Sequence, residues 1–306
     1  SELMVAIANL SRMNSGVTMQ LRLVQVTGIN YQERINKNED LYAITDSPAA
    51  DALRNQYGAD LVTLITKDKG GNYCGLAWVL NGLDNVAWRQ KYGYNILNFD
   101  CLGGTIFAHE SGHNMGGLHD HANAGSGGWM PFAYGYQDPQ GKFATVMAYA
   151  TGGTCTNSYC DKILYFSTPK LSYLGRPIGK ADWADMVRLL NMTSPFVASF
   201  RAAKVTSAAL PAFDLIAPAD MTELPSKNTV FTWNAVAGAT HYQLNISNAA
   251  KTFSYRTFIN ASACSSTCSF DTTGVTNWNP PAIDDITWRI RAFNSVYQNA
   301  KGSTQV

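Results

Sequence analysis

The chemistry of this chain is concentrated in the stretch HESGHNMGGLHD, which begins at His109 and contains three of the five histidines. On a helix, His109 and His113 lie about one turn apart, so both imidazoles can reach one metal ion. Glu110 falls on the same flank, where its carboxylate can contact a water held by that ion. Gly116 can adopt a left-handed conformation that breaks the helix and lets the chain return with His119 as a third ligand. Three protein ligands leave one position open for water, as in a catalytic rather than a structural zinc site.

A site of this kind can hydrolyse an amide bond. Zinc lowers the pKa of its bound water to about 7 and polarises the carbonyl under attack. Glu110 would accept a proton from that water and hand it to the leaving amine. The motif does not identify the acyl donor, so a zinc hydrolase of non-peptide amides is an alternative. Another alternative is a helix with ordinary histidines followed by a Gly-rich loop.

The spacing H-E-x-x-H-x-x-G-x-x-H resembles that of the metzincin metallopeptidases, whose second element is a methionine-containing turn beneath the metal. The stretch TVMAY at residues 145–149 is similar to this Met-turn. The resemblance implies that Met147 forms the apolar floor of the zinc site, whereas the alternative is an ordinary core methionine. Tyr149 resembles the tyrosine of astacins and serralysins that approaches zinc or stabilises the oxyanion. The alternative for Tyr149 is a packing tyrosine.

Asp120 directly follows the third histidine, and this His-Asp ending resembles the reprolysin branch. The resemblance implies that Asp120 has a structural role or holds a ligand loop. The resemblance covers about residues 1–203 and includes the stretches LRNQYGADLV, YCGLA and YFSTP. Within that branch the sequence resembles the bacterial peptidyl-Asp metalloendopeptidases of the Asp-N type. His121 is expected to be a loop residue, because three ligands already complete the set.

This resemblance implies an endopeptidase that acts on proteins and peptides and cleaves next to Asp. The substrate would lie extended along the edge strand of the sheet, for which 75–79 is the candidate. An aspartate in the pocket beyond the scissile bond calls for a positive group. Lys170 and Arg176 follow the Met-turn, where metzincins build the wall of that pocket. Either can equally be a solvated surface residue.

The flanking sequence predicts the elements that position these residues. Apolar residues from Leu3 to Leu10 have helical spacing, and residues 17–26 alternate as a strand does. Asp46-Ser47-Pro48 is a helix start, and that helix should end near Gly58. Further elements are expected as strands at 59–66 and 73–80, the active-site helix at 105–115, and a helix at 182–190 that ends near Asn191. This order predicts an α/β metzincin domain with a mixed, twisted sheet and an active-site helix.

The composition changes after about Arg201. Residues 204–211 are small and predict a linker between two domains, 1–203 and 212–306. Strand candidates in the second domain lie at 229–233, 242–247, 253–259, 269–271 and 287–293, and predict an all-β sandwich. This segment resembles a fibronectin type III or immunoglobulin-like module, which could bind substrate or carbohydrate, for example through Trp278. An adhesion or binding protein with a secondary protease domain is therefore an alternative function.

Bulk composition limits the other functions. The formal net charge is +1 without a long run of Lys or Arg, which argues against binding nucleic acid or an acidic membrane. No apolar stretch approaches the roughly 20 residues that span a bilayer.

The six cysteines lack a C-x-x-C zinc pattern and indicate disulfides in an oxidising compartment, with six free thiols as the alternative. Of the many pairings possible, the preferred set is Cys74–Cys101, Cys155–Cys160 and Cys264–Cys268.

Ser1 is expected to begin a mature chain, secreted as a precursor whose signal peptide and pro-segment have been removed. The expected cofactor is one catalytic Zn²⁺ ion. Calcium is conceivable, but no pattern in the sequence supports it. We expect a monomer.

Overall fold

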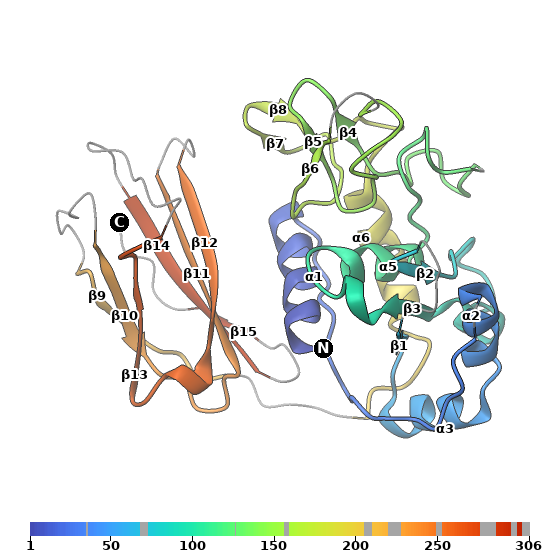
Figure 1. The fold of residues 1–306 in the computed structure, drawn as a ribbon, viewed down its shortest axis with the longest axis horizontal. Coiled ribbons are helices and arrows are strands. Elements are labelled where there is room, and N and C mark those ends of the chain that lie inside the picture. Colours follow the sequence, from blue (N-terminus) through green and yellow to red (C-terminus); the bar gives the residue numbers. More distant parts are fainter. Residues whose placement is uncertain are drawn as a thin grey trace. The chain divides into compact units, whose positions relative to one another are not determined.

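The computed structural model describes residues 1–34, 36–67, 73–125, 127–155, 159–204, 210–219, 228–248, 253–275, 286–294 and 299–301 (Figure 1). The chain forms two units, Ser1–Thr206 and Ser207–Val306. This division falls within the predicted linker 204–211, of which 205–209 lie outside the described residues, as does Trp278. Within the described ranges, no helix is both long and apolar enough to cross a membrane.

The first unit combines helices with a main sheet and two smaller sheets. Its helices are α1 (Glu2–Ser15), α2 (Lys37–Thr45), α3 (Pro48–Tyr57), α4 (Val86–Arg89), α5 (Ile106–His113) and α6 (Met186–Val197). The main sheet contains β1 (Val62–Thr66), β2 (Gly75–Ala77) and β3 (Tyr94–Asn98). The smaller sheets contain β4 (Gln137–Asp138), β5 (Phe143–Ala144) and β6 (Asp161–Lys162), and β7 (Ser172–Tyr173) with β8 (Arg176–Pro177).

The main sheet is mixed, in the strand order β1-β3-β2. The central strand β3 runs parallel to β1 and antiparallel to β2, so Leu64 and Leu76 both lie opposite Ile96. One apolar cluster joins β1 and β3 to α2 and α3 through residues such as Leu41 and Ile44. A second cluster joins α1, α5 and α6. The predicted α/β organisation with a mixed sheet is therefore present, and β2 lies at an edge of that sheet.

Local sequence explains why α3 starts and ends where predicted. The Ser47 hydroxyl accepts a hydrogen bond from the Ala50 amide at 3.3 Å, and Pro48 occupies the first turn. The helix ends at Gly58, whose φ of 62° is left-handed and therefore favours glycine. By contrast, α2 was not predicted from the sequence, although the Asn36 side chain caps it by accepting from the Asn38 amide.

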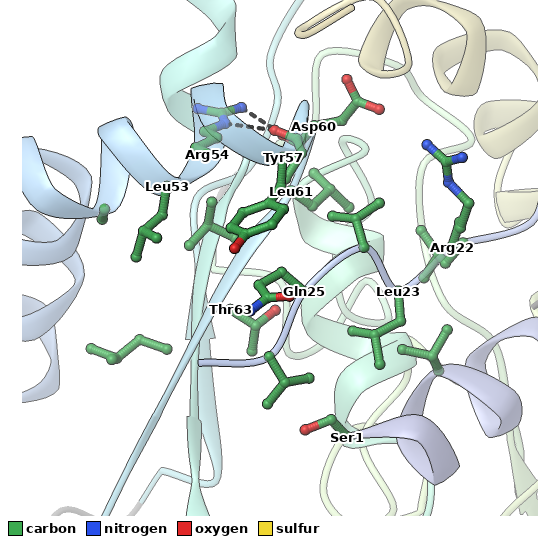
Figure 2. Close-up of a pocket in the computed structure, with 18 of the residues that line it drawn as sticks. Ser1, Arg22, Leu23, Gln25, Leu53, Arg54, Tyr57, Asp60, Leu61 and Thr63 are labelled. Carbon is green, nitrogen blue, oxygen red and sulfur yellow. Dashed lines mark hydrogen bonds between the residues drawn. The ribbon is translucent and has the colours of Figure 1, made fainter. Parts of the chain in front are cut away.

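The strand predicted over 17–26 is wrong. Side chains from two helices hold this segment in place of a strand ladder: Asn9 bonds both backbone groups of Leu21, and Asn191 accepts from the Thr18 amide. A cavity of about 620 Å³ separates the segment from β1, and Leu23, Gln25 and Thr63 contribute to its lining (Figure 2). The lining does not include the three motif histidines, so this cavity is separate from the predicted chemistry.

The predicted end of the last helix is also wrong, because α6 runs from Met186 to Val197 and contains Pro195. Proline cannot donate the hydrogen bond that a residue at this position gives to the carbonyl four residues earlier, so backbone bonding alone does not favour a helix through Pro195. The Asp185 side chain caps the start by accepting from the Arg188 amide at 3.1 Å. Burial of Leu190 and Val197 in the cluster with α1 stabilises the helix beyond the expected end.

The second unit contains two antiparallel sheets that share one apolar core. Its strands are β9 (Leu215–Ala217), β10 (Val230–Asn234), β11 (His241–Asn248), β12 (Ser254–Asn260), β13 (Thr267–Asp271), β14 (Ile286–Phe293) and β15 (Asn299–Lys301). The sheets have the orders β13-β10-β9 and β12-β11-β14-β15. Alternate residues such as Phe231 and Trp233 point into the core, as period-two strands require. Each of the five predicted strands has a counterpart between β10 and β14.

All three preferred disulfides are present, at Cys74–Cys101, Cys155–Cys160 and Cys264–Cys268. The first joins the residue before β2 to the short 3₁₀ turn Phe99–Cys101. It thereby ties the start of the edge strand to the segment that leads into α5.

Candidate metal centre and active site

Helix α5 and the turn after it bring three histidine nitrogens together. The Nε2 atom of His113 lies 3.1 Å from Nε2 of His109 and 3.1 Å from Nε2 of His119. His109 and His113 come from successive turns of α5, and both are buried. His119 comes from the segment that follows the helix. The sequence motif therefore folds into the convergent arrangement predicted from its spacing.

The second ring nitrogen of each histidine is held by a backbone carbonyl. Nδ1 lies 2.8 Å from the Val146 oxygen in His109, 2.7 Å from the Gly117 oxygen in His113, and 3.2 Å from the Asn123 oxygen in His119. Donation from Nδ1 to a carbonyl leaves the lone pair on Nε2, where a metal ion needs it. These contacts therefore set both the tautomer and the direction of each ring.

Gly116 makes the return of the chain possible for two reasons. Its φ of 94° is left-handed, and a Cβ atom there would lie 2.9 Å from the Leu80 oxygen and 2.7 Å from Trp129 Nε1. The Gly116 amide donates to the His113 oxygen, which closes the last turn of the helix. A larger residue at this position would displace the segment that carries His119.

The three nitrogens fit a tetrahedral metal ion. An ion with Zn–N bonds of about 2.0–2.1 Å keeps its ligands about 3.3 Å apart, close to the two spacings of 3.1 Å. Desolvation lowers the pKa of all three histidines, that of His113 to about 3. All three imidazoles are therefore neutral at physiological pH, and each can offer a nitrogen lone pair to a metal ion. Within the described ranges these three residues are the one cluster of His, Cys, Asp or Glu that could hold an ion.

Glu110 is buried on the flank of the histidine cluster, against the edge strand β2. Desolvation raises its pKa to about 8 in the absence of a metal. A cation at the histidines would act in the opposite direction and favour the carboxylate. A Cβ atom on Gly75 would lie 2.7 Å from both Cγ and Cδ of Glu110. The missing side chain at residue 75 therefore provides the space in which the carboxylate lies.

We expect Gly75→Ala to reduce the turnover of any reaction at this site by about 10- to 100-fold, because the added methyl group displaces the Glu110 carboxylate. Metal content should stay unchanged, since the three atoms nearest to the added methyl group all belong to Glu110, which is not a ligand. The matched control is Gly28→Ala, where a Cβ atom meets nothing within 4 Å. Steady-state kinetics with metal analysis checks this, and native turnover in Gly75→Ala would contradict it.

Met147 lies beneath the histidine cluster and is fully buried. A Cβ atom on Gly112 of α5 would collide with the Met147 sulfur, so this sulfur packs directly on the helix between the two histidine turns. The Met147 side chain also belongs to the apolar cluster that contains Ala108 and Phe166. Met147 therefore packs against the helix that carries His109 and His113, and its role as the floor of the site stays a prediction.

Asp120 connects the segment of the third histidine to the Met-turn. One carboxylate oxygen accepts from the Tyr149 amide at 3.1 Å, and both accept from Asn123 Nδ2. The Tyr149 ring lies 4.2 Å from that of His119, and 41% of the residue is exposed, which leaves it accessible to a substrate. Desolvation, followed by the charge of Glu110, raises the pKa of Tyr149, so its hydroxyl keeps its proton.

His121 points away from the cluster, as expected for a loop residue. Its ring stacks between Tyr134 and Trp183, with centroids 3.6 and 4.0 Å away, and its Nε2 lies 2.7 Å from the Trp183 oxygen. It therefore anchors the segment after His119 to the chain that precedes α6.

Lys170 and Arg176 lie in and beside the small β7–β8 hairpin. Lys170 is exposed in the turn that leads to β7. Arg176 Nε forms an ion pair with Asp138 Oδ2 at 2.5 Å, and Arg176 also donates to Gln140. The charge of Arg176 is thus already matched by a carboxylate, whereas Lys170 faces solvent.

Two polar residues at the site, the buried Asn114 and the half-buried Lys162, were missed by the sequence analysis. The side-chain nitrogen of Asn114 lies 2.7 Å from the Tyr92 oxygen and 2.9 Å from the Tyr94 oxygen, which ties the end of α5 to β3. Lys162 of β6 reaches the backbone of the Met-turn. Asn114 adjoins His113 in the sequence and could have been suspected on that ground, but Lys162 lies outside the histidine motif and the Met-turn.

Three histidines on H-E-x-x-H-x-x-G-x-x-H, a buried methionine beneath them and a glutamate beside them define a metzincin-type metallopeptidase centre. Residues 2–120 match the family described as Metallo-peptidase family M12B Reprolysin-like. Residues 2–120, within the first unit, are therefore similar to a reprolysin-like metallopeptidase domain.

The curated relatives make the resemblance more specific. A protein of Xanthomonas campestris pv. campestris named "Peptidyl-Asp metalloendopeptidase" is 35% identical over 207 residues, covering 65% of this chain and 46% of the relative. A protein of the same name from Pseudomonas aeruginosa is 33% identical over 228 residues, covering 66% of this chain and 36% of the relative. The chain thus spans less than half the length of these relatives.

A solved structure described as a chaperone–substrate complex is similar in fold to part of this chain. The TM-score is 0.50 at 22% identity, over 65% of this chain and 30% of the other. At this level of identity the similarity concerns the fold alone.

Proposed function

We propose that this protein is a zinc-dependent endopeptidase that holds one catalytic Zn²⁺ ion on His109, His113 and His119. The observation that carries the proposal is the convergence of three Nε2 atoms beside a buried carboxylate, Glu110. Bound zinc would supply an acidified water and a polarised carbonyl. The names of the curated relatives favour peptides over other amides as the substrate.

Each neighbouring residue has a distinct role in this proposal. Glu110 takes a proton from the attacking water and returns it to the leaving amine, which requires the ionised form that a nearby cation favours. The Tyr149 hydroxyl, protonated and accessible, donates a hydrogen bond to the oxygen that becomes negatively charged. Strand β2 offers its edge to an extended substrate, which would add as a further strand beside Glu110.

We also propose that the enzyme cleaves next to Asp, as the names of its relatives say of those proteins. A pocket for an aspartate side chain requires a cation. Lys170 is our first candidate because it is exposed, and Arg176 is our second because Asp138 already neutralises it. A competing carboxylate would weaken the attraction of Arg176 for a substrate.

The test is to digest one denatured protein with the full chain and identify the released peptides by mass spectrometry. We expect chelator-sensitive cleavage with sites concentrated beside Asp. Lys170→Ala should lower the preference for Asp about tenfold, a charge-pair contribution of roughly 1.4 kcal/mol. Lys180→Ala, a change of another exposed lysine, is the control. Cleavage that survives chelation would contradict the metal mechanism, and sites without Asp would contradict the specificity.

We propose further that the protein acts outside the cell after removal of a pro-segment, as a monomer. Three disulfides support an oxidising environment. The second unit, with two antiparallel sheets around one core, we interpret as a fibronectin type III-like sandwich at 212–306 that follows the peptidase domain at 1–203. Its proposed role is to bind substrate or carbohydrate.

A further inference from the structure

The Lys162 ammonium is surrounded by backbone carbonyls of the Met-turn. Nζ lies 2.8 Å from the Val146 oxygen and 3.2 Å from the Thr145 oxygen, and it also donates to the Ala148 oxygen. An ammonium has three N–H donors and accepts nothing, so three carbonyls satisfy it completely. No donor is left for a substrate carboxylate, and Lys162 is therefore not a pocket cation of the kind proposed for Lys170.

The same contacts reach a metal ligand through one shared atom. The Val146 oxygen, 2.8 Å from Lys162 Nζ, is also 2.8 Å from His109 Nδ1. The carbonyls of Val146 and Ala148 belong to the residues on either side of Met147. Lys162 thus holds the peptide groups that flank the floor of the site and the acceptor that sets the direction of the His109 ring.

We propose that Lys162 is a positioning residue for the metal centre: it fixes the Met-turn carbonyls so that His109 Nε2 stays aimed at the ion. The proposal rests on the zinc-dependent function proposed above. Lys162 comes from β6, which pairs with β5 just before the Met-turn, so the small sheet β4-β5-β6 becomes a support for the metal ligands.

Two effects of Lys162 on zinc affinity oppose each other. Its positive charge lies 2.8 Å from the carbonyl oxygen that also contacts His109, so it repels a divalent cation held by the histidines. Against this, partners that orient metal ligands typically contribute about 10- to 100-fold in metal affinity. Three carbonyl dipoles and the nearby carboxylate of Asp120 offset the charge, so we expect the orienting effect to dominate.

The test compares Lys162→Met with the native full chain and with Lys67→Met, a change of an exposed lysine at the end of β1. Methionine keeps most of the stem volume but removes all three donors. We expect Lys162→Met to bind Zn²⁺ about 10- to 100-fold more weakly in competition with a chelating dye. Loaded with excess zinc, it should have a lower kcat with a KM within about twofold of native. The visible absorption of the Co²⁺-substituted variant should also differ from that of native protein, because the ligand geometry changes.

Unchanged zinc affinity together with an unchanged Co²⁺ spectrum would overturn the proposal, and so would tighter zinc binding. Lower thermal stability alone would show only a structural role. If Lys162→Met does not fold, NMR of the native protein tests the proposal instead. The ¹⁵Nζ signal of the exchange-protected Lys162 should shift when a chelator removes zinc. A signal that does not move would overturn the proposal. Native protein that binds no zinc would instead contradict the proposed function itself.

Discussion

Replacing Glu110 with alanine is expected to lower peptide cleavage by about 10³-fold or more while leaving the zinc content near one ion per chain. The Glu110 carboxylate is buried beside the histidine cluster, where it can accept a proton and return it. It supplies no ligand atom to the convergent Nε2 set, so the ion should remain bound. Proteolysis rates and zinc analysis on the same preparation provide the measurement.

Glu110→Gln separates chemistry from packing in this experiment. Glutamine has nearly the same shape and fills the space beside Gly75, but it cannot take up the proton. We expect it to be as inactive as the alanine variant, while Glu39→Ala, which changes an exposed glutamate on α2, should remain fully active. Native proteolysis in either Glu110 variant would refute the mechanism.

Replacing His119 with alanine is expected to weaken zinc binding by more than about 10²-fold and to abolish cleavage with it. Two nitrogens from α5 would remain, and neither the open ligand position nor the geometry of the site would be preserved. Equilibrium dialysis or competition with a chelating dye measures the loss. Activity should return in part at high zinc concentration only if the remaining two ligands still place the ion beside Glu110.

The control for that experiment is His241→Ala, a histidine on β11 of the second unit. It should bind zinc and cleave peptides as the native chain does. If His119→Ala retains native zinc affinity, the third ligand has been assigned to the wrong residue, even if activity falls.

The histidine cluster was predictable because the positions of its residues follow from their spacing along a helix and from one glycine at which the chain can turn. Two histidines four residues apart on α5 share a face, and Gly116 is the position at which the chain must turn. Met147 and Asp120 could be predicted only through resemblance, since nothing in their local sequence shows that they contact α5 or the Met-turn. Two disulfides, Cys155–Cys160 and Cys264–Cys268, were predictable in pairing because their partners are close in sequence, and they leave Cys74 and Cys101 as the third pair.

The remaining features depend on contacts between distant segments. Lys162 lies 15 residues beyond Met147 on a two-residue strand, and no local pattern distinguishes it from a surface lysine. The segment at 17–26 alternates like a strand, yet bonds from Asn9 and Asn191 hold it instead. The alternation of apolar residues therefore did less to decide the conformation of this segment than its hydrogen bonds to Asn9 and Asn191. The sequence does not reveal where those two side chains lie.

The carbonyls that orient the three histidines belong to Val146, Gly117 and Asn123, and all three are main-chain groups. No exchange of one side chain for another can delete such an acceptor. A mutation can therefore remove these acceptors from the histidines only by moving the backbone. Substitutions at the glycines and at the residues that anchor the loops are thus expected to be more harmful than substitutions at the acceptor residues themselves. An engineer who reshapes the substrate pocket can accordingly vary the side chain of residue 146 within its volume, provided that the course of the backbone is conserved.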